Sequence, residues 1–161
     1  MNIILGGLYH YYGVTKSMLW LFFHPSLWHK GIGISGMPKI DGIANLKVGN
    51  DVYINDKVYI QCLEDVEIGN NVTISYGSVI LTSGLDTENY VENCTTRVKP
   101  HKNQKVVIGN GVWLGARTVV LPGVIIADKI VVGAGSVVTK SLDKSGWLYA
   151  GVPAKPIKAL S

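Results

Sequence analysis

Apolar residues recur at every sixth position along much of the second half of this chain. The clearest series is Ile108, Leu114, Val120, Ile126, Val132 and Val138. A helix repeats its apolar positions every 3.6 residues and a strand every two, so a period of six fits neither element. One short strand and a sharp turn use about six residues, and three such units close a triangular coil of about eighteen. The period therefore predicts stacked coils, about 4.8 Å apart, with the apolar series pointing inward.

The same series exists earlier in the chain, starting at residue 48. Its members are Val48, Ile54, Ile60, Ile68, Ile74 and Ile80. The step from Ile60 to Ile68 is eight residues, so we expect Glu64-Asp65 or their neighbours to bulge outward. A second matched series lies four residues after the later apolar positions, and its members are all small or β-branched: Val112, Thr118, Val124, Ile130 and Ser136.

Composition agrees with an all-β solenoid. The 161 residues include 20 Val, 16 Ile and 19 Gly but only 7 Ala, which favours short strands and many turns over a helix bundle. The net charge is +4 without a run of five or six cations, which argues against a nucleic-acid-binding tail. Cys62 and Cys94 lack metal-ligand spacing and are interpreted as two free thiols in a reducing compartment, which predicts a cytoplasmic protein.

The first thirty residues differ from the rest and predict a separate N-terminal segment, residues 1–30, before a β-helix domain over 31–161. They contain seven of the fourteen aromatic residues but only two charged ones. Thr15 is a candidate cap for a short helix over Lys16 to Phe23. We expect this segment to pack on the body or on a neighbouring subunit; the alternative is peripheral contact with a membrane or a lipid-linked substrate. No cleavable signal is evident, and Met18 to Phe23 is too short to span a bilayer.

A polar stretch over residues 83–105 interrupts the period, which then resumes in phase. Long polar excursions from a regular fold are usually functional or disordered. This one contains His101, the only histidine outside the N-terminal segment. We therefore expect the chemistry of the protein to involve this loop.

Several segments carry a resemblance to a known family. They are Val107-Ile108-Gly109-Asn110-Gly111-Val112-Trp113-Leu114-Gly115-Ala116, Leu121-Pro122-Gly123-Val124, Gly133-Ala134-Gly135-Ser136-Val137-Val138-Thr139-Lys140 and Ala150-Gly151-Val152-Pro153-Ala154-Lys155-Pro156-Ile157. Over roughly Leu46 to Ile157 the chain resembles the hexapeptide-repeat acyltransferases, which include the galactoside and maltose acetyltransferases. The resemblance implies a left-handed parallel β-helix, acetyl-CoA as co-substrate, and a homotrimer. It also implies active sites between neighbouring subunits, with the long loop of one reaching over the next.

The expected general base departs from the pattern of this family. The family places a histidine near the start of the loop, where this chain has Leu85. His101 is our candidate replacement, because an imidazole titrates near neutral pH, and Asp86 or Glu88 is the candidate to orient its ring. The alternatives are a substrate-binding role for His101 or an exposed loop histidine without a role.

The remaining candidates also come from the resemblance. Trp113 matches a tryptophan near the thioester sulfur, the alternative being an outward side chain that packs between subunits. Asn55 matches a contact to the acceptor sugar, the alternative being an exposed turn residue. Ala116 and Ala134 match positions whose backbone forms hydrogen bonds with the pantetheine arm. Four polar residues are candidates to bind the CoA phosphates, the alternative being that their side chains are only solvated: Thr139, Lys140, Lys155 and Lys158.

These observations favour acetyl-CoA-dependent O-acetylation of a sugar or surface-polysaccharide hydroxyl, without a metal. One alternative is N-acylation of an amino sugar or a small amine. Another, raised by Leu85, is an inactive or purely structural β-helix. A zinc carbonic anhydrase needs three convergent histidines, and the coils over residues 48–80 and 106–143 contain none, so we exclude that class.

Overall fold

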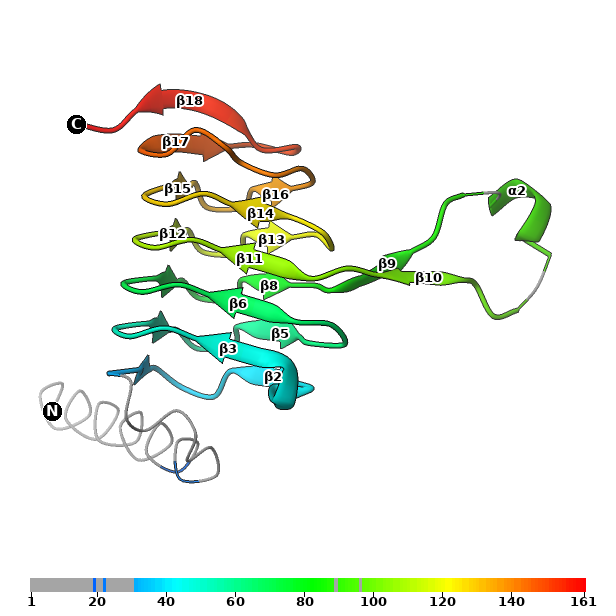
Figure 1. Ribbon diagram of the computed structural model, residues 1–161, viewed down its shortest axis with the longest axis horizontal. Coiled ribbons are helices and arrows are strands. Elements are labelled where there is room, and N and C mark those ends of the chain that lie inside the picture. The colour runs from blue at the N-terminus through cyan, green and yellow to red at the C-terminus, as the bar shows by residue number, and fades with distance from the viewer. Residues whose placement is uncertain (1–18, 20–21, 23–30, 89, 96) are drawn as a thin grey trace, which may run out of the picture.

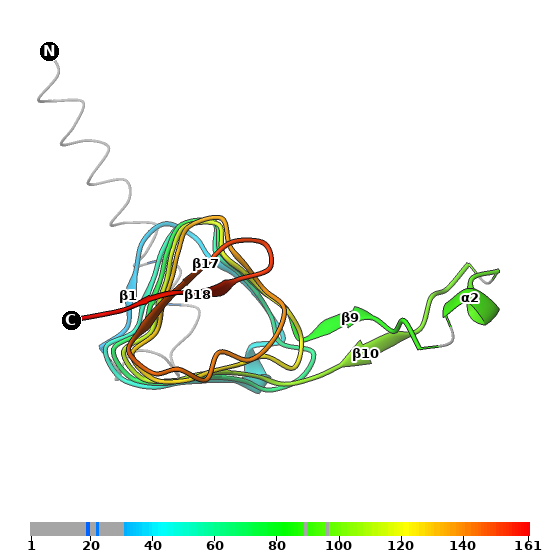
Figure 2. The same cartoon turned by 90° about the horizontal axis from the view of Figure 1, so that it is seen from above.

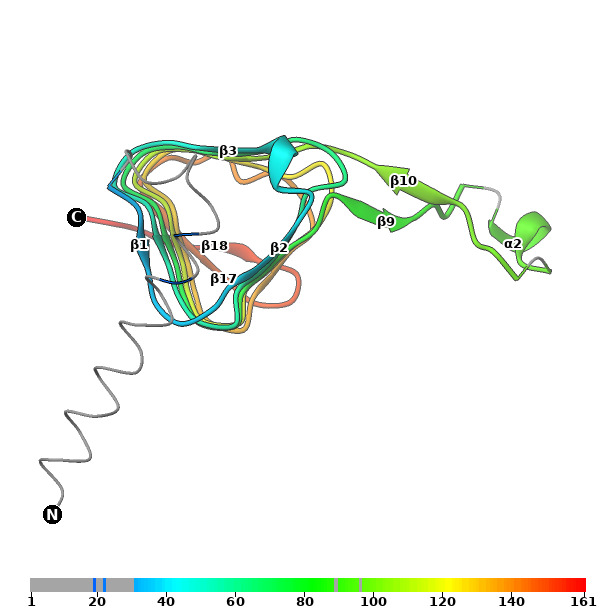
Figure 3. The same cartoon turned by 90° about the horizontal axis from the view of Figure 1, so that it is seen from below.

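The chain winds into a triangular prism of stacked coils, with one long projection (Figure 1). The structure is a computed structural model that describes residues 19, 22, 31–88, 90–95 and 97–161. Viewed from either end, the coils superimpose as a triangle with three flat faces (Figures 2 and 3). This is the predicted left-handed parallel β-helix, in which each face is a sheet of short parallel strands from successive coils, apart from the last strand of the first face, which runs antiparallel.

Each face collects strands that are far apart in sequence. The first face contains β1 (Gly33–Ile34), β4 (Tyr53–Ile54), β7 (Thr73–Ile74), β12 (Trp113–Leu114), β15 (Val131–Val132), β17 (Trp147–Ala150) and β18 (Lys155–Ala159). The second face contains β2 (Lys39–Asp41), β5 (Tyr59–Gln61), β8 (Val79–Ile80), β13 (Val119–Val120) and β16 (Val137–Val138). The third face contains β3 (Leu46–Val48), β6 (Val66–Ile68), β11 (Val106–Ile108) and β14 (Ile125–Ile126).

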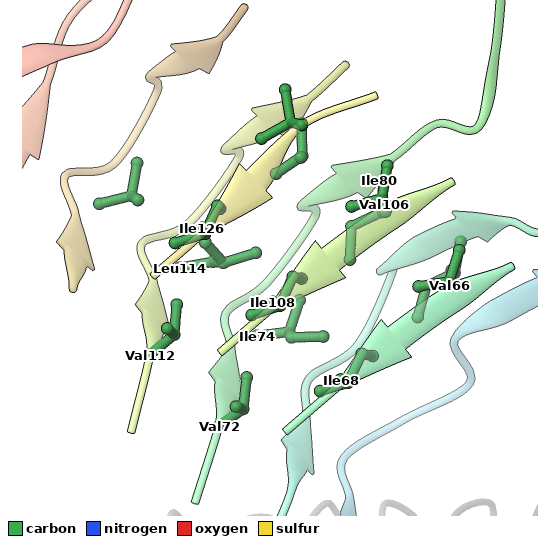
Figure 4. Close-up of a cluster of buried hydrophobic side chains, with 14 of the residues drawn as sticks. Val66, Ile68, Val72, Ile74, Ile80, Val106, Ile108, Val112, Leu114 and Ile126 are labelled. Carbon is green, nitrogen blue, oxygen red and sulfur yellow. The ribbon is translucent and has the colours of Figure 1, made fainter. Parts of the chain in front are cut away.

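The predicted apolar ladder is confirmed, and it forms the core. All twelve ladder residues, from Val48 to Val138, are buried. Figure 4 shows members of neighbouring coils, such as Ile74 and Leu114, stacked in the interior. The five members of the second matched series, from Val112 to Ser136, are buried as well. Since no single coil can cover its own inner side chains, each coil is stabilised by the coils above and below it.

The predicted coil length of eighteen holds only after the polar stretch. There Trp113 pairs with Val131, eighteen residues further on. Before the stretch, Tyr53 pairs with Thr73, so these coils contain twenty residues. The two extra residues lie between the second and third faces, where a 3-10 turn, η2 (Ile43–Asn45), occupies the first coil. In the second coil the predicted bulge is present, with Leu63 and Glu64 exposed.

The corner between the third and first faces carries a polar ladder of its own. Its members are Asn50, Asn70, Asn110 and Asp128 in successive coils. Each of the first three donates its backbone N–H to the side-chain Oδ1 of the next, at 2.8, 2.9 and 2.7 Å. The bonds from Asn110 hold the pKa of the Asp128 carboxyl below its usual range. We call residues 49–51, 69–71, 109–111 and 127–129 the asparagine corner.

The polar stretch forms an arm that leaves the prism from the corner between the second and third faces (Figure 2). Its base is an antiparallel pair, β9 (Ser83–Leu85) with β10 (His101–Asn103), and its tip carries a short helix, α2 (Tyr90–Asn93). β6 on one side of the arm pairs residue for residue with β11 on the other, Val66 with Val106. The arm is therefore an insertion that leaves the stacking register intact.

The last strand turns back on the prism. β18 runs antiparallel to β17 at the C-terminal end of the first face (Figure 1). All five of its residues are exposed. The family-like segment from Ala150 to Ile157 forms this reversal, and Val152–Pro153 within it is a cis peptide.

Our expectations for residues 1–30 fall almost wholly outside the described residues. Of that segment only Leu19 and Phe22 are described, and both are exposed. Within the described part of the chain, no helix is long and apolar enough to cross a membrane. Both cysteines are free as predicted, Cys62 buried and Cys94 exposed, and burial raises the pKa of the Cys62 thiol to about 11.

Candidate functional site

The corner between the first and second faces changes character along the prism. We call it the first corner and define it by residues 55–57, 75–77, 115–117 and 133–135. Its later coils contain small residues, Gly115-Ala116 and Gly133-Ala134. Its earlier coils contain polar and aromatic ones, such as Asn55 and Tyr76. The first corner therefore has a half with small residues, in the later coils, and a polar half with hydrogen-bonding and aromatic side chains, in the earlier coils.

Trp113 lies where these two halves meet. It is on β12 of the first face, and its side chain is 53% exposed. Its indole Nε1–H donates to Ser75 Oγ in the coil below, at 2.9 Å. An exposed indole that is fixed in this way presents a flat apolar surface without having to be ordered by a ligand.

In the small-residue half of the first corner, the glycine carbonyls accept hydrogen bonds, whereas two backbone N–H groups have no partner among the described residues. The buried hydroxyls of Thr118 and Ser136 donate to the carbonyls of Gly115 and Gly133, at 2.7 and 2.6 Å. The Ala116 carbonyl accepts the N–H of Gly135 at 2.8 Å. Among the described residues, none accepts a hydrogen bond from the N–H of Ala116 or Ala134. Two backbone donors are thus available beside the tryptophan.

Asn55 is half-buried at the other end of the same corner. Its Nδ2 donates to the carbonyl of Ile74 at 3.2 Å, while its backbone N–H donates to the same carbonyl at 3.0 Å. These bonds fix the amide on the coil that also supplies Ser75. The structure therefore places Asn55, Trp113, Ala116 and Ala134 along one edge of the prism.

His101 is the first residue of β10 and lies opposite Leu85 in the arm. Its side chain is exposed, and its Nδ1 lies 2.9 Å from the carbonyl oxygen of Lys99. A carbonyl only accepts hydrogen bonds, so Nδ1 carries the hydrogen in this contact. In the neutral ring the other nitrogen, Nε2, is then unprotonated and able to accept a proton.

The two acids expected to orient this ring are engaged elsewhere. Asp86 Oδ1 accepts the backbone N–H of Glu88 at 3.0 Å, and the Asp86 N–H donates to the Pro100 carbonyl at 2.9 Å. The Glu88 carboxylate lies 3.5 Å from the Lys102 ammonium. Asp86 thus shapes the loop next to His101, while the backbone of Lys99 holds the imidazole.

The four candidates for the CoA phosphates lie in two places. Thr139 and Lys140 follow β16 at the far end of the second face, and Lys155 and Lys158 lie on β18. All four are exposed. They surround the C-terminal end of the prism without forming one cluster.

A single chain does not bring the arm to the tryptophan. The arm leaves from the corner opposite the first face, and it points away from the prism (Figures 2 and 3). Trp113 and Asn55 belong to the first face and its corner, whereas His101 belongs to the arm. Any site that combines them needs the arm of another copy.

The sequence analysis missed three side chains at the first corner: Lys57, Tyr76 and Arg117. Lys57 Nζ lies 5.4 Å from the Tyr76 ring centroid, and the Arg117 N–H donates to the Tyr76 carbonyl at 2.9 Å. The period contains a signal for them, since each falls two or three residues after a ladder position. The predictions from the period used the ladder positions and the residues four after them, and not this register.

Comparison with known proteins agrees with this architecture. Residues 105–140 match the bacterial transferase hexapeptide (six repeats). A relative from Escherichia coli K12, named "Putative lipopolysaccharide biosynthesis O-acetyl transferase WbbJ", is 37% identical over 118 residues, which is 68% of this chain and 58% of the relative. The chain spans about half the length of the curated relatives it matches.

Two solved structures share the fold. A maltose O-acetyltransferase from Clostridium difficile 630 superimposes with a TM-score of 0.71 at 28% identity, covering 81% of this chain and 67% of that one. A galactoside acetyltransferase in complex with coenzyme A gives a TM-score of 0.70 at 28% identity, covering 81% and 64%. By its repeat, its coiled architecture and these relatives, the chain belongs to the hexapeptide-repeat acyltransferase family.

Proposed function

We propose that this protein transfers the acetyl group of acetyl-CoA to a hydroxyl of a saccharide, within a homotrimer whose sites lie between neighbouring copies. The observation that carries the proposal is the exposed, hydrogen-bonded Trp113 beside a small-residue corner. A relative of the same fold was solved with coenzyme A, and the curated relative is named for O-acetyl transfer in lipopolysaccharide biosynthesis.

The first corner suits the pantetheine arm of acetyl-CoA. The available N–H groups of Ala116 and Ala134 would donate to its amide carbonyls, and their small side chains allow a close approach. The Trp113 indole would pack beside the thioester. Thr139, Lys140, Lys155 and Lys158 lie toward the C-terminal end, where the phosphates would be placed. Asn55, on the opposite side of Trp113, would contact the acceptor.

The arm of a neighbouring copy would supply the base. Nε2 of His101 takes the proton of the acceptor hydroxyl while the hydroxyl oxygen bonds to the acetyl carbonyl carbon. The carbon–sulfur bond then breaks, and the imidazolium returns its proton to the departing CoA thiolate. The Lys99 carbonyl keeps the ring in the required tautomer through Nδ1. Asp86 acts in this scheme by holding the loop.

The transfer is tested by following thiol release from acetyl-CoA with a series of saccharide and amino-sugar acceptors. We expect His101→Gln to lower kcat by a factor of about 10² to 10⁴, while CoA still raises the melting temperature. Asn103→Ala, on the same strand, is the matched control and should leave both unchanged. If the protein neither binds CoA nor transfers acetyl groups, the structural β-helix is the correct alternative, which the replacement of the family histidine by Leu85 suggested. A His101→Gln variant with full activity would show that the base lies elsewhere.

The shared site is tested by complementation. A His101→Ala copy lacks the base on its arm, and a Trp113→Ala copy lacks the indole at its corner. If one arm and one corner come from different copies, random mixing at equal amounts restores about one quarter of the wild-type sites. Mixed oligomers that stay inactive would place the whole site within one chain, and light scattering that gives a monomer would exclude the trimer.

A further inference from the structure

Lys57, Tyr76 and Arg117 form a strip along the first corner, with Lys57 and Tyr76 in its polar half and Arg117 next to Ala116. They lie on three successive coils, and all three side chains are exposed, Tyr76 by 39%. Lys57 Nζ lies 5.4 Å from the Tyr76 ring centroid. On the other side, the backbone N–H of Arg117 donates to the Tyr76 carbonyl. Tyr76 therefore lies on the coil between the two that carry these cations.

The strip carries two cations, and the charge of only one described acid, Asp56, acts on Lys57. None of the four ion pairs among the described residues involves Lys57 or Arg117. The acid next to Lys57, Asp56, accepts the backbone N–H of Met37 at 3.0 Å. The Tyr76 side chain raises the pKa of the Lys57 ammonium, whereas Arg117, being a like charge, acts in the opposite direction. The two cations are thus close enough to repel each other.

The backbone at these cations is unfavourable for side chains. Lys57 and Arg117 have φ angles of 57° and 58°, in the left-handed region. The equivalent positions in the neighbouring coils are Gly77 and Gly135, with φ angles of 68° and 70°. Glycine adopts this conformation without steric cost, so the fold by itself favours glycine at all four positions. The backbone conformation therefore does not itself select a lysine or an arginine at these positions.

A neighbouring arm would not supply the missing negative charge. The arm over residues 83–103 has three Lys or Arg residues and three Asp or Glu residues, so its formal charges cancel. Glu88 is already paired with Lys102. Bringing such an arm over the first corner adds no net negative charge, so an anionic ligand is the group that would balance the strip.

We infer that Lys57, Tyr76 and Arg117 bind an oxyanion carried by the acceptor, so that the acceptor is a phosphorylated or acidic saccharide. The inference rests on the proposed function, because it assigns the acceptor of the same site. The Arg117 guanidinium offers two parallel N–H donors, which match a phosphate or a carboxylate. Lys57 adds a point charge, and the Tyr76 ring offers an apolar surface for the sugar ring. Asn55 and Trp113 lie along the same edge.

The test compares acceptors that differ in charge. Glucose, glucuronic acid, glucose 1-phosphate and UDP-glucose are compared by kcat/KM at fixed acetyl-CoA and by calorimetric titration without acetyl-CoA. Arg117→Gly should lower kcat/KM for the charged acceptors roughly tenfold or more and leave glucose unchanged. Arg117→Lys should retain part of the preference. The charged sugar whose kcat/KM falls most in Arg117→Gly shows whether the site binds a carboxylate or a phosphate.

The matched control is Lys129→Gly. Lys129 also has a left-handed φ, 57°, but lies at the asparagine corner. Both glycine variants remove a cation and relieve the same backbone conformation, so both should keep or raise the melting temperature. Only Arg117→Gly should change acceptor preference.

Each result bears on one proposal. Equal kcat/KM for glucose and the charged sugars, or a loss in Arg117→Gly that is equal for all acceptors, overturns the inference and leaves acetyl transfer standing. A raised KM for acetyl-CoA alone would overturn it too, because the cations would then serve the donor. Tight calorimetric binding of a charged sugar that depends on Arg117, without any transfer, supports the inference and overturns the proposed function.

Discussion

The prism and its arm are built in opposite ways. In the prism, every ladder side chain from Val48 to Val138 is buried against the coils above and below. In the arm, all three residues of β10 are exposed, and the part of the arm next to the prism is held by the backbone pairing of β9 with β10. Apolar burial therefore fixes the shape of the prism residue by residue. The arm keeps its side chains at the surface, so side chains such as His101 are available for chemistry.

The largest expected effect is the difference in stability between truncating a buried leucine of the prism and truncating an exposed leucine of the arm. Leu114→Ala removes a fully buried ladder residue and should lower the free energy of unfolding by about 2 to 5 kcal/mol. Leu85→Ala, in the arm, truncates a leucine that is 46% exposed and should cost less than about 0.5 kcal/mol. Urea unfolding of both variants checks this. Equal losses would mean that the arm contributes to the core.

A smaller effect is expected from a buried hydroxyl of the prism. Ser136 Oγ donates to the Gly133 carbonyl and accepts the Gly151 N–H at 3.0 Å. Ser136→Ala leaves both partners without this contact and should cost about 1 to 2 kcal/mol. Thr95→Ala, which removes an exposed hydroxyl from the arm, is the control and should be neutral. A neutral Ser136→Ala would show that other groups satisfy the corner.

Replacing the arm should change stability still less. Ser83 and Asn103 pair directly at its base, so residues 84–102 can be replaced by Asn-Gly, a favoured two-residue hairpin turn. Because the entropy of closing a loop varies slowly with its length, we expect the free energy of unfolding to change by less than about 1 kcal/mol. Acetyl transfer should be lost completely. Circular dichroism during thermal unfolding measures the change in stability. If the shortened chain failed to fold, the prism would depend on the arm, which would contradict the separation of the two regions.

The smallest expected effect concerns pH and the asparagine corner. Since the pKa of Asp128 is lowered in the folded state, its charged form stabilises the fold at pH values above its ordinary value of 3.8. This contribution is lost as the pH falls through the lower folded value. Asp128→Asn keeps an acceptor oxygen for Asn110 but removes the titration.

The measurement is urea unfolding at about pH 6 and about pH 3, on either side of the ordinary aspartate value. The wild type should lose more stability than Asp128→Asn between these conditions. Asp143→Asn, at an exposed aspartate, controls for the loss of one charge and should behave as the wild type. Identical pH dependence of wild type and Asp128→Asn would refute the role of the carboxyl.

Much of the prism could be predicted because apolar side chains at a period of six have one consistent explanation. The ladder and the bulge near Glu64 follow from it. The twenty-residue length of the second coil is contained in the eight-residue step from Ile60 to Ile68. The first coil did not follow, since the eight-residue step from Ile40 to Val48 hides it from a search at period six. The Gly-Asn pairs that begin at residues 49, 69 and 109 are the sequence signal for the asparagine ladder. That these asparagines stack on one another can be predicted only when the length of each coil is known.

The candidate site was less predictable, for a physical reason. Sequence spacing locates a residue along one coil and gives no distance between an arm and a face of another copy. His101 could be selected by its chemistry, but its contact with the Lys99 carbonyl depends on the turn before β10. The strip at Lys57, Tyr76 and Arg117 is split over sixty residues of sequence and comes together only by stacking.

The reversed strand at the end of the prism also bears on aggregation. A stack of parallel coils has no natural end, since its last coil exposes strand edges on which another molecule could continue the stack. β18 covers the edge of the first face in the opposite direction. It also places Pro156, which lacks an N–H, and two lysines on the new edge. At this end of the first face, the antiparallel strand with its proline and lysines therefore disfavours the addition of a further strand from another molecule.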